Sequence, residues 1–298
     1  MKDIFLLQSV YSLTLMILEI PTGYFADRTG RKNSILIGAS LGFAGYLTYS
    51  LSFGFWQFVV AEIILGVSQS LVSGADSAML YDTLAGGKQT EKYTKLEGRI
   101  TSIGNFGEAF AGIIGGLLAV LSLRTPFYVQ TCVALIAIPA ALMLTEPPVQ
   151  TIKRKFGLSE IRSILFKSLH GDVKLKWNTF FSAITGAATL TMAWFAQPYF
   201  GQIQIPVSMY GVLWAALNLS VGVAAIVAWR FEKRFGAPIT VILFTSALFG
   251  SYLALPFMPG YTGLGMLLVF YLARGLATPT LRNYINIITT SDVRATVL

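Results

Sequence analysis

The sequence predicts an all-α integral membrane protein, a bundle of about nine transmembrane helices. Of its 298 residues, 54% are hydrophobic and only 12% are charged, and the mean hydropathy is +0.65. A soluble domain carries roughly 25% charged residues, so most of this chain must face lipid or other apolar helices. The apolar runs reach the ~20 residues that a spanning helix needs, whereas a transmembrane strand needs only about ten.

Nine apolar runs are long enough to cross a bilayer. They cover residues 5–25, 34–53, 57–80, 100–121, 126–144, 178–200, 208–229, 238–257 and 262–281. Short segments separate most of them, and the first separator is the charged loop Gly23–Lys32. The chain therefore reads as a series of closely connected antiparallel spans.

A long polar segment divides the spans into two sets. We expect an N-terminal half-bundle at 1–146, a linker at 147–176 and a C-terminal half-bundle at 177–298. Leu158, Ile161, Leu165 and Leu169 share one helical face, which predicts a short amphipathic helix at the membrane surface. A simple tether is the alternative. The two halves repeat a similar order of spans and loops, as transporter repeats do.

The basic residues indicate how the chain is oriented. Nearly all of the 22 Lys and Arg lie in every second loop, and the alternate loops hold only Arg124. The positive-inside rule then places Gly23–Lys32 and 147–176 in the cytoplasm, in a multi-pass protein of the plasma membrane. The net charge of +8 does not predict nucleic-acid binding, because the basic residues form no continuous face.

Several kinds of chemistry are not expected. Cys132 is the only cysteine and His170 the only histidine, which argues against a disulfide framework and a histidine-based metal cluster. The sequence contains neither H-E-x-x-H nor the phosphate-binding pattern G-x-x-x-x-G-K-[ST]. We expect no enzyme activity, no cofactor and no metal.

The charged loop carries a recognisable pattern. It matches G-x-x-x-D-[RK]-x-G-R-[RK] at Gly23, Asp27, Arg28, Gly30, Arg31 and Lys32. This resembles the cytoplasmic loop signature of the major facilitator superfamily. In that family the loop joins the second and third of twelve spans. The resemblance therefore implies that the chain corresponds to spans two to ten and the start of eleven, incomplete relative to the twelve-helix fold.

The same resemblance implies a conformational latch. The family pattern has an acid at the position of Asp82, and an arginine such as Arg31 can form a bidentate pair with a carboxylate. We predict an Arg31–Asp82 contact, while Asp27 can accept hydrogen bonds at a helix start. The predicted latch consists of Gly23, Asp27, Arg28, Gly30, Arg31, Lys32 and Asp82. The alternative is that these charges only keep the loop in water.

Ionisable residues inside spans are costly and usually face the bundle interior. Candidates for a substrate or proton site are Glu108, Asp76, Glu62, Glu19 and Arg274. Glu108, near the middle of its span, can bind a cation, carry a proton or simply accept hydrogen bonds. Asp76 can instead belong to the latch, Glu62 can be partly exposed, and Arg274 can extend toward the membrane surface.

Two further patterns suggest contacts within the membrane. Trp194 and Gln197 are candidates to touch an apolar substrate, with an interfacial aromatic belt as the alternative for the aromatic residues of this span. Helix packing is predicted at Gly112, Gly115 and Gly116. The stretch Ala111–Gly116 also resembles the G-P-x-x-G-G signature of family exporters, without its first Gly and its Pro.

The resemblance implies secondary active transport of a small molecule by alternating access, with proton-coupled efflux as a finer expectation. The expected partners are a small-molecule substrate, the lipid bilayer and protons. The alternative is a truncated, non-transporting membrane protein.

Overall fold

The computed structural model describes residues 2–147, 173–206, 209–258, 260–289 and 294. In this part of the chain the regular structure is entirely helical. The elements are α1 (Lys2–Thr29), α2 (Arg31–Leu51), α3 (Phe55–Val72), α4 (Ala75–Gly86), η1 (Thr90–Lys92), α5 (Tyr93–Leu121), α6 (Thr125–Leu142), α8 (Val173–Gln202), α9 (Tyr210–Ala254), η3 (Leu255–Phe257) and α10 (Tyr261–Ile288). The predicted all-α class is confirmed. The amphipathic helix expected around Leu158–Leu169 lies outside the described residues.

Eight helical stretches of the described chain are long and apolar enough to cross a membrane. One of them, Tyr210–Phe257, contains a break at Gly236, whose φ of 76° is not helical. Pro238 follows this break and cannot donate a backbone hydrogen bond to the preceding turn. Counted as two segments, this stretch gives the described residues the nine expected spans.

The expected run 57–80 lies inside one membrane-length stretch, Phe55–Gly86, in which Gly74, with a φ of 74°, separates α3 from α4. One expectation was wrong. The segment Gly23–Lys32 is not an extended loop, because α1 continues to Thr29 and α2 begins at Arg31. Only Gly30 lies between them, with a φ of 101° that side chains other than glycine rarely allow.

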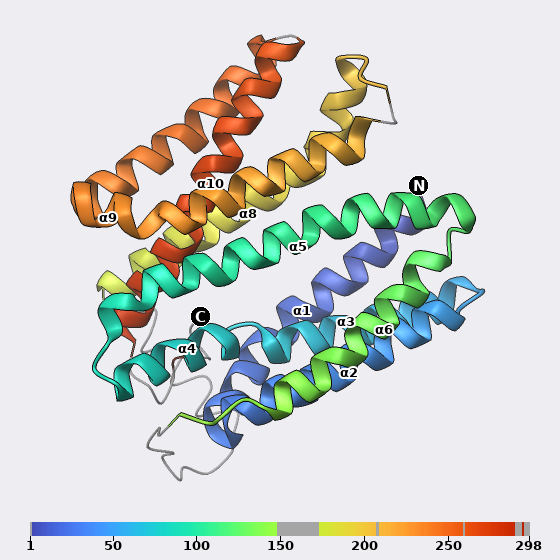
Figure 1. The fold of residues 1–298 in the computed structure, drawn as a ribbon, viewed down its shortest axis with the longest axis horizontal. Helices are drawn as coiled ribbons and strands as arrows, with labels where there is room; N and C mark the ends of the chain where they lie inside the picture. Colours follow the sequence, from blue (N-terminus) through green and yellow to red (C-terminus); the bar gives the residue numbers. More distant parts are fainter. Residues whose placement is uncertain (1, 148–172, 207–208, 259, 290–293, 295–298) are drawn as a thin grey trace. The chain divides into compact units, whose positions relative to one another are not determined.

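The chain forms two compact units. Unit 1 comprises residues 1–90, 118–177 and 285–298, and unit 2 comprises 91–117 and 178–284. In unit 1, α3 packs against α1 and α2, and α2 also packs against α6, as the blue and green helices show (Figure 1). The half-bundles expected at 1–146 and 177–298 are defined by the order of spans in the sequence, and this division remains a prediction.

Small residues bring the helices of unit 1 together. A Cβ atom added to Gly45 would lie 2.7 Å from the Leu65 side chain, and one on Gly66 would lie 2.8 Å from Thr14. Hydroxyl groups bridge the same helices: Ser34 on α2 donates to the Leu71 carbonyl at 2.6 Å. Close backbones and hydroxyl bridges are typical of helix packing in membranes.

The core of unit 2 is formed by α8, α9 and α10. Phe200, Phe244, Phe270 and Tyr271 are almost fully buried in one apolar cluster. In α5, the Ser102 hydroxyl donates to the Gly222 carbonyl of α9 at 2.6 Å.

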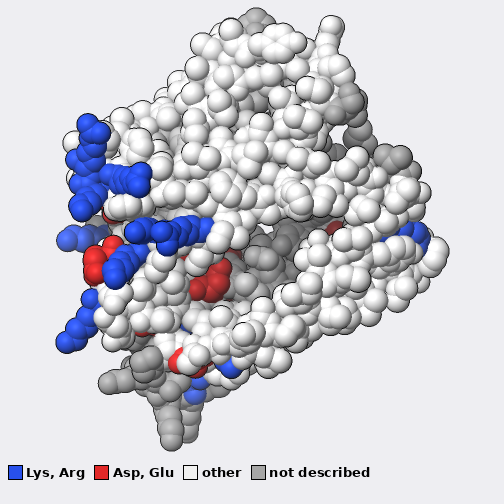
Figure 2. All heavy atoms as spheres, viewed as in Figure 1, with Lys and Arg blue, Asp and Glu red and all other residues white. Residues whose placement is uncertain are grey.

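The outer surface fits an apolar solvent. Large apolar side chains are exposed on most helices, including Ile136 at 66% and Phe249 at 65%. On the face shown in Figure 2, uncharged residues cover most of the surface. A soluble protein rarely exposes so many large apolar side chains.

Candidate functional site

Four charged side chains meet in unit 1 and form what we name the ion cluster: Asp27, Arg31, Asp82 and Arg294. Arg31 Nη2 lies 3.3 Å from the Asp27 carboxylate, and Arg31 also forms an ion pair with Asp82. Asp82 forms a second ion pair with Arg294. Arg31 is only 2% exposed and Asp82 only 6%. The predicted Arg31–Asp82 contact is confirmed.

The ion cluster balances its charges, with two guanidinium groups facing two carboxylates. Balance matters because each buried ion loses several kcal/mol of hydration that only a close partner restores. Arg294 also donates to the Thr289 carbonyl at 2.7 Å, next to the C-terminal end of α10, where the helix dipole is negative. Its guanidinium lies 4.3 Å from the centre of the Tyr81 ring.

Burial, with Arg31 acting in the same direction, lowers the pKa of Arg294 to about 10. The group therefore keeps its proton at neutral pH, so its ion pair with Asp82 persists there.

Glu146 satisfies the first backbone groups of α2. Its carboxylate accepts the N–H groups of Arg31 at 2.8 Å and Lys32 at 2.7 Å. These groups have no partner inside the helix, and they lie at the positive end of its dipole. A Cβ atom on Gly30 would lie 3.1 Å from the same carboxylate. Gly30 is thus needed both for its positive φ and for the approach of Glu146.

Replacing Glu146 with alanine should lower the free energy of unfolding by about 1–2 kcal/mol, the typical loss for a helix N-cap. Thermal unfolding in detergent, followed by circular dichroism, measures the change. Glu91→Ala is the matched control, because Glu91 is an exposed residue of η1 in the other unit. Equal losses in both variants would contradict the capping role.

The other predicted latch residues occupy the same hairpin. Arg28 donates to the Tyr24 hydroxyl at 3.3 Å, Gly23 is buried in α1, and Lys32 contributes its backbone N–H to Glu146. Asp76 is exposed, and its carboxylate accepts the N–H of Ser77 at 2.6 Å. The structure therefore does not bring Asp76 into the ion cluster.

The candidate intramembrane residues lie in separate places. The Glu19 carboxylate accepts a hydrogen bond from Ser73 at 3.2 Å, and Glu62 is only 4% exposed. Glu108 is exposed on α5. The Arg274 guanidinium lies 5.7 Å from the centre of the Tyr271 ring, in a cation–π arrangement. Glu108 and Arg274 both lie within electrostatic range of the Tyr271 hydroxyl in unit 2, whereas Glu19 and Glu62 belong to unit 1.

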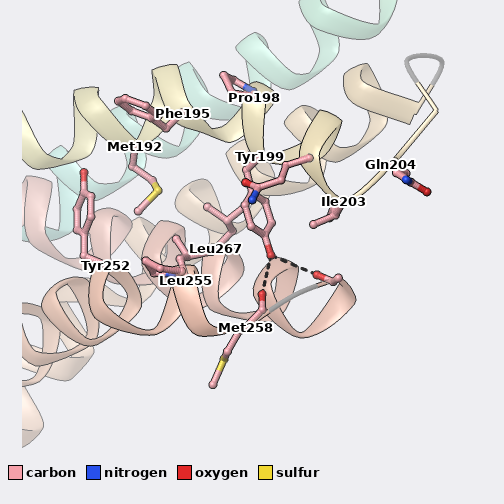
Figure 3. Close-up of a pocket in the computed structure, with 13 residues that line it drawn as sticks. Met192, Phe195, Pro198, Tyr199, Ile203, Gln204, Tyr252, Leu255, Met258 and Leu267 are labelled. Carbon is pink, nitrogen blue, oxygen red and sulfur yellow. Dashed lines mark hydrogen bonds between the residues drawn. The ribbon is translucent and has the colours of Figure 1, made fainter.

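An apolar cavity of about 850 Å³ lies in unit 2, between α8, the end of α9 and the start of α10 (Figure 3). Met192, Phe195 and Tyr199 line it from α8, and Leu255 and Leu267 from the other elements. The Tyr199 hydroxyl donates to the carbonyls of Met258 at 3.0 Å and Gly260 at 3.3 Å. The candidates Trp194 and Gln197 are exposed on α8 and are not among the lining residues.

The predicted packing glycines of α5 have no close neighbours. A Cβ atom on Gly112, Gly115 or Gly116 would meet no described atom within 4 Å. These glycines therefore do not bring α5 against another helix in the described structure. The close approach of α5 instead occurs at Gly98, which faces the Ala225 backbone of α9.

Sequence reasoning missed Glu146 and Arg294. Both lie at or beyond the ends of apolar runs, where a single charge looks like an ordinary loop residue. Glu146 directly precedes Pro147-Pro148, the proline pair that ends an apolar run in the sequence. An acid at that position was a usable indication of a role at a helix end. For Arg294 the only signal in the sequence was a single basic residue near the end of the chain.

The helices and the ion cluster define a multi-pass helical membrane protein. The family model of the Major Facilitator Superfamily matches residues 3–298. The chain belongs to this superfamily.

Curated relatives resemble part of the chain. It is 22% identical over 191 residues to the quinolone resistance protein NorA of Staphylococcus aureus (strain MSSA476), covering 64% of this chain and 46% of that protein. It is 32% identical over 133 residues to the uncharacterized MFS-type transporter YqjV of Bacillus subtilis (strain 168), covering 42% and 30%. The chain thus spans less than half the length of these two relatives.

Solved structures share the fold. The human organic anion transporter MFSD10 aligns with a TM-score of 0.77 at 15% identity, over 98% of this chain and 72% of that one. The E. coli fucose:proton symporter FucP aligns with a TM-score of 0.74 at 16% identity, over 100% and 81%.

Proposed function

We propose that the chain acts in secondary transport of a small molecule across the plasma membrane, by alternating access. The observation that carries this proposal is the superfamily match over residues 3–298 together with the transporter fold. The curated relative NorA is named for quinolone resistance, which favours export over uptake. The basic residues of every second loop favour a cytoplasmic position for the ion cluster.

The ion cluster serves as the latch in this proposal. It joins the ends of α1 and α2 to α4 and to the segment after α10. Breaking it exposes or separates buried charges, which is costly, so the cluster favours one arrangement of these helix ends. A substrate that binds the other conformation more tightly can then shift the equilibrium toward that conformation.

Proton coupling requires an acid inside the membrane that can take up and release a proton. Glu108 is the candidate for this role, because it lies near the middle of α5 and its side chain is exposed. Reconstituted protein tests coupling directly: Glu108→Gln should abolish the dependence of flux on a pH gradient while leaving the fold intact.

Transport itself is tested in proteoliposomes that contain the full chain, with a quinolone as the first probe. We expect gradient-driven movement above that of empty liposomes, and at least a roughly tenfold slower rate for Asp82→Asn. Asp3→Asn is the control, since Asp3 is an exposed residue in the first turn of α1. If a broad set of small molecules shows no flux, the non-transporting alternative is favoured.

A further inference from the structure

A second cavity lies inside unit 1 and has a character of its own. It measures about 330 Å³ and is bordered by α1, α2, α3 and α6. The lining residues are Gln8, Tyr11, Gly42, Tyr46, Tyr49, Glu62, Leu65, Ser68, Gln69 and Phe127. A cavity of this size is at the lower end of the range for small-molecule sites.

The chemistry of the cavity centres on Glu62. Its side chain is 4% exposed, in the first half of α3. Within the described chain no lysine or arginine forms an ion pair with it, and none lines the cavity. Its polar partner is the Tyr49 hydroxyl, which donates a hydrogen bond to the carboxylate. One phenol hydrogen bond does not replace the hydration of a buried carboxylate.

Aromatic rings form much of the wall. Tyr11, Tyr46, Tyr49 and Phe127 contribute rings from three helices. Tyr49 is held in place by stacking on Phe127, with ring centres 4.7 Å apart, and by Phe58 at 4.9 Å. Aromatic faces attract a cation through their quadrupole, most strongly when the cation has lost its water.

Two polar groups of the wall are engaged elsewhere. The Ser68 hydroxyl donates to the Gly38 carbonyl at 2.8 Å, and Tyr46 is hydrogen-bonded to Gln130. The rest of the lining offers one carboxylate, the side-chain amides of Gln8 and Gln69, and several aromatic faces.

We propose that this cavity binds a small organic cation of the ammonium type, with Glu62 as the counter-charge and the tyrosine and phenylalanine rings as its walls. The cation replaces the missing partner of Glu62. The site lies within unit 1, and binding at it does not require that the chain transport anything. Its volume of about 330 Å³ has room for a small ammonium group.

Choline is a suitable probe because it has a quaternary ammonium group of matching size. The full chain is purified in an uncharged detergent, and its melting temperature is followed by circular dichroism as choline chloride replaces sodium chloride at constant ionic strength. A ligand that binds only the folded state raises the melting temperature with concentration. We expect a saturable rise of several degrees, and no such rise with dimethylbutanol, the uncharged carbon isostere of choline.

Variants assign the effect to the cavity. Glu62→Gln keeps the shape of the side chain and removes the charge, and it should weaken choline binding by roughly tenfold or more. Phe127→Leu removes one aromatic wall while keeping the charge of Glu62, and it should weaken binding. Glu91→Gln changes an exposed glutamate of the other unit and should leave the choline response unchanged.

Three outcomes would overturn the proposal. An equal response in the wild type and in Glu62→Gln would show that the carboxylate is not the counter-charge, as when it carries a proton. Equal shifts with choline and dimethylbutanol would show an apolar site. If Glu62→Gln does not fold, an unchanged choline response in Phe127→Leu would be sufficient to reject the site.

Discussion

Replacing Asp82 with alanine is expected to lower the free energy of unfolding by about 3–5 kcal/mol, the cost of removing one partner from a buried ion pair. Asp82 pairs with both Arg31 and Arg294. Its loss leaves two guanidinium groups, each less than 10% exposed, facing each other without the carboxylate between them. Asp27 then remains as the only acid of the ion cluster.

The measurement is thermal or denaturant-induced unfolding in detergent, with circular dichroism as the readout. Asp76→Ala is the matched control, because Asp76 lies on the same helix and is exposed. It should cost no more than about 1 kcal/mol, as for most surface changes. Comparable losses of unfolding free energy in the two variants would mean that the buried ion pairs of Asp82 stabilise the protein no more than an exposed carboxylate does.

A compensating variant separates lost pairing from lost packing. Replacing all four members of the ion cluster, Asp27, Arg31, Asp82 and Arg294, with methionine or leucine removes the charges that Asp82→Ala leaves behind. Well-packed apolar side chains often replace a buried ionic group at little or no cost. We therefore expect this quadruple variant to be more stable than Asp82→Ala, while losing the latch.

The fold class and most spans followed from the sequence because apolar run length depends on the bilayer alone. The contact of Arg31 with Asp82 was also predictable, because the loop pattern identified Arg31 and the family resemblance placed an acid at Asp82. The division between α3 and α4 was not predictable from the sequence. Gly74 interrupts a run that stays apolar on both sides, and hydropathy does not report a positive φ.

Partners that come from distant parts of the chain were also beyond sequence reasoning. Glu146 reaches α2 across 115 residues, and Arg294 reaches Asp82 from beyond α10. Nothing in their local sequence indicates which helix end they meet. The burial of Glu62 has the same origin, since its aromatic neighbours come from α1, α2 and α6.

Replacing glycines of α5 with alanine is expected to give a second large effect on the free energy of unfolding, with opposite signs at Gly98 and Gly112. Gly98→Ala is expected to lower the free energy of unfolding by about 1–3 kcal/mol or more, the range for overpacking. The added methyl would overlap the Ala225 carbonyl oxygen, which belongs to the backbone of α9 and cannot rotate away. Either α5 or α9 must then shift, and the Ser102–Gly222 hydrogen bond lies one turn away.

Gly112→Ala is the matched partner on the same helix. A methyl there meets no described atom within 4 Å, and alanine favours a helix over glycine by roughly 0.5–1 kcal/mol. We expect this variant to be as stable as the wild type or slightly more stable in detergent unfolding. If Gly112→Ala instead destabilises the protein and Gly98→Ala does not, the contact face of α5 is the one that the sequence suggested. Because both substitutions add the same methyl group to one helix, their difference depends on the position of α9 and not on helix propensity.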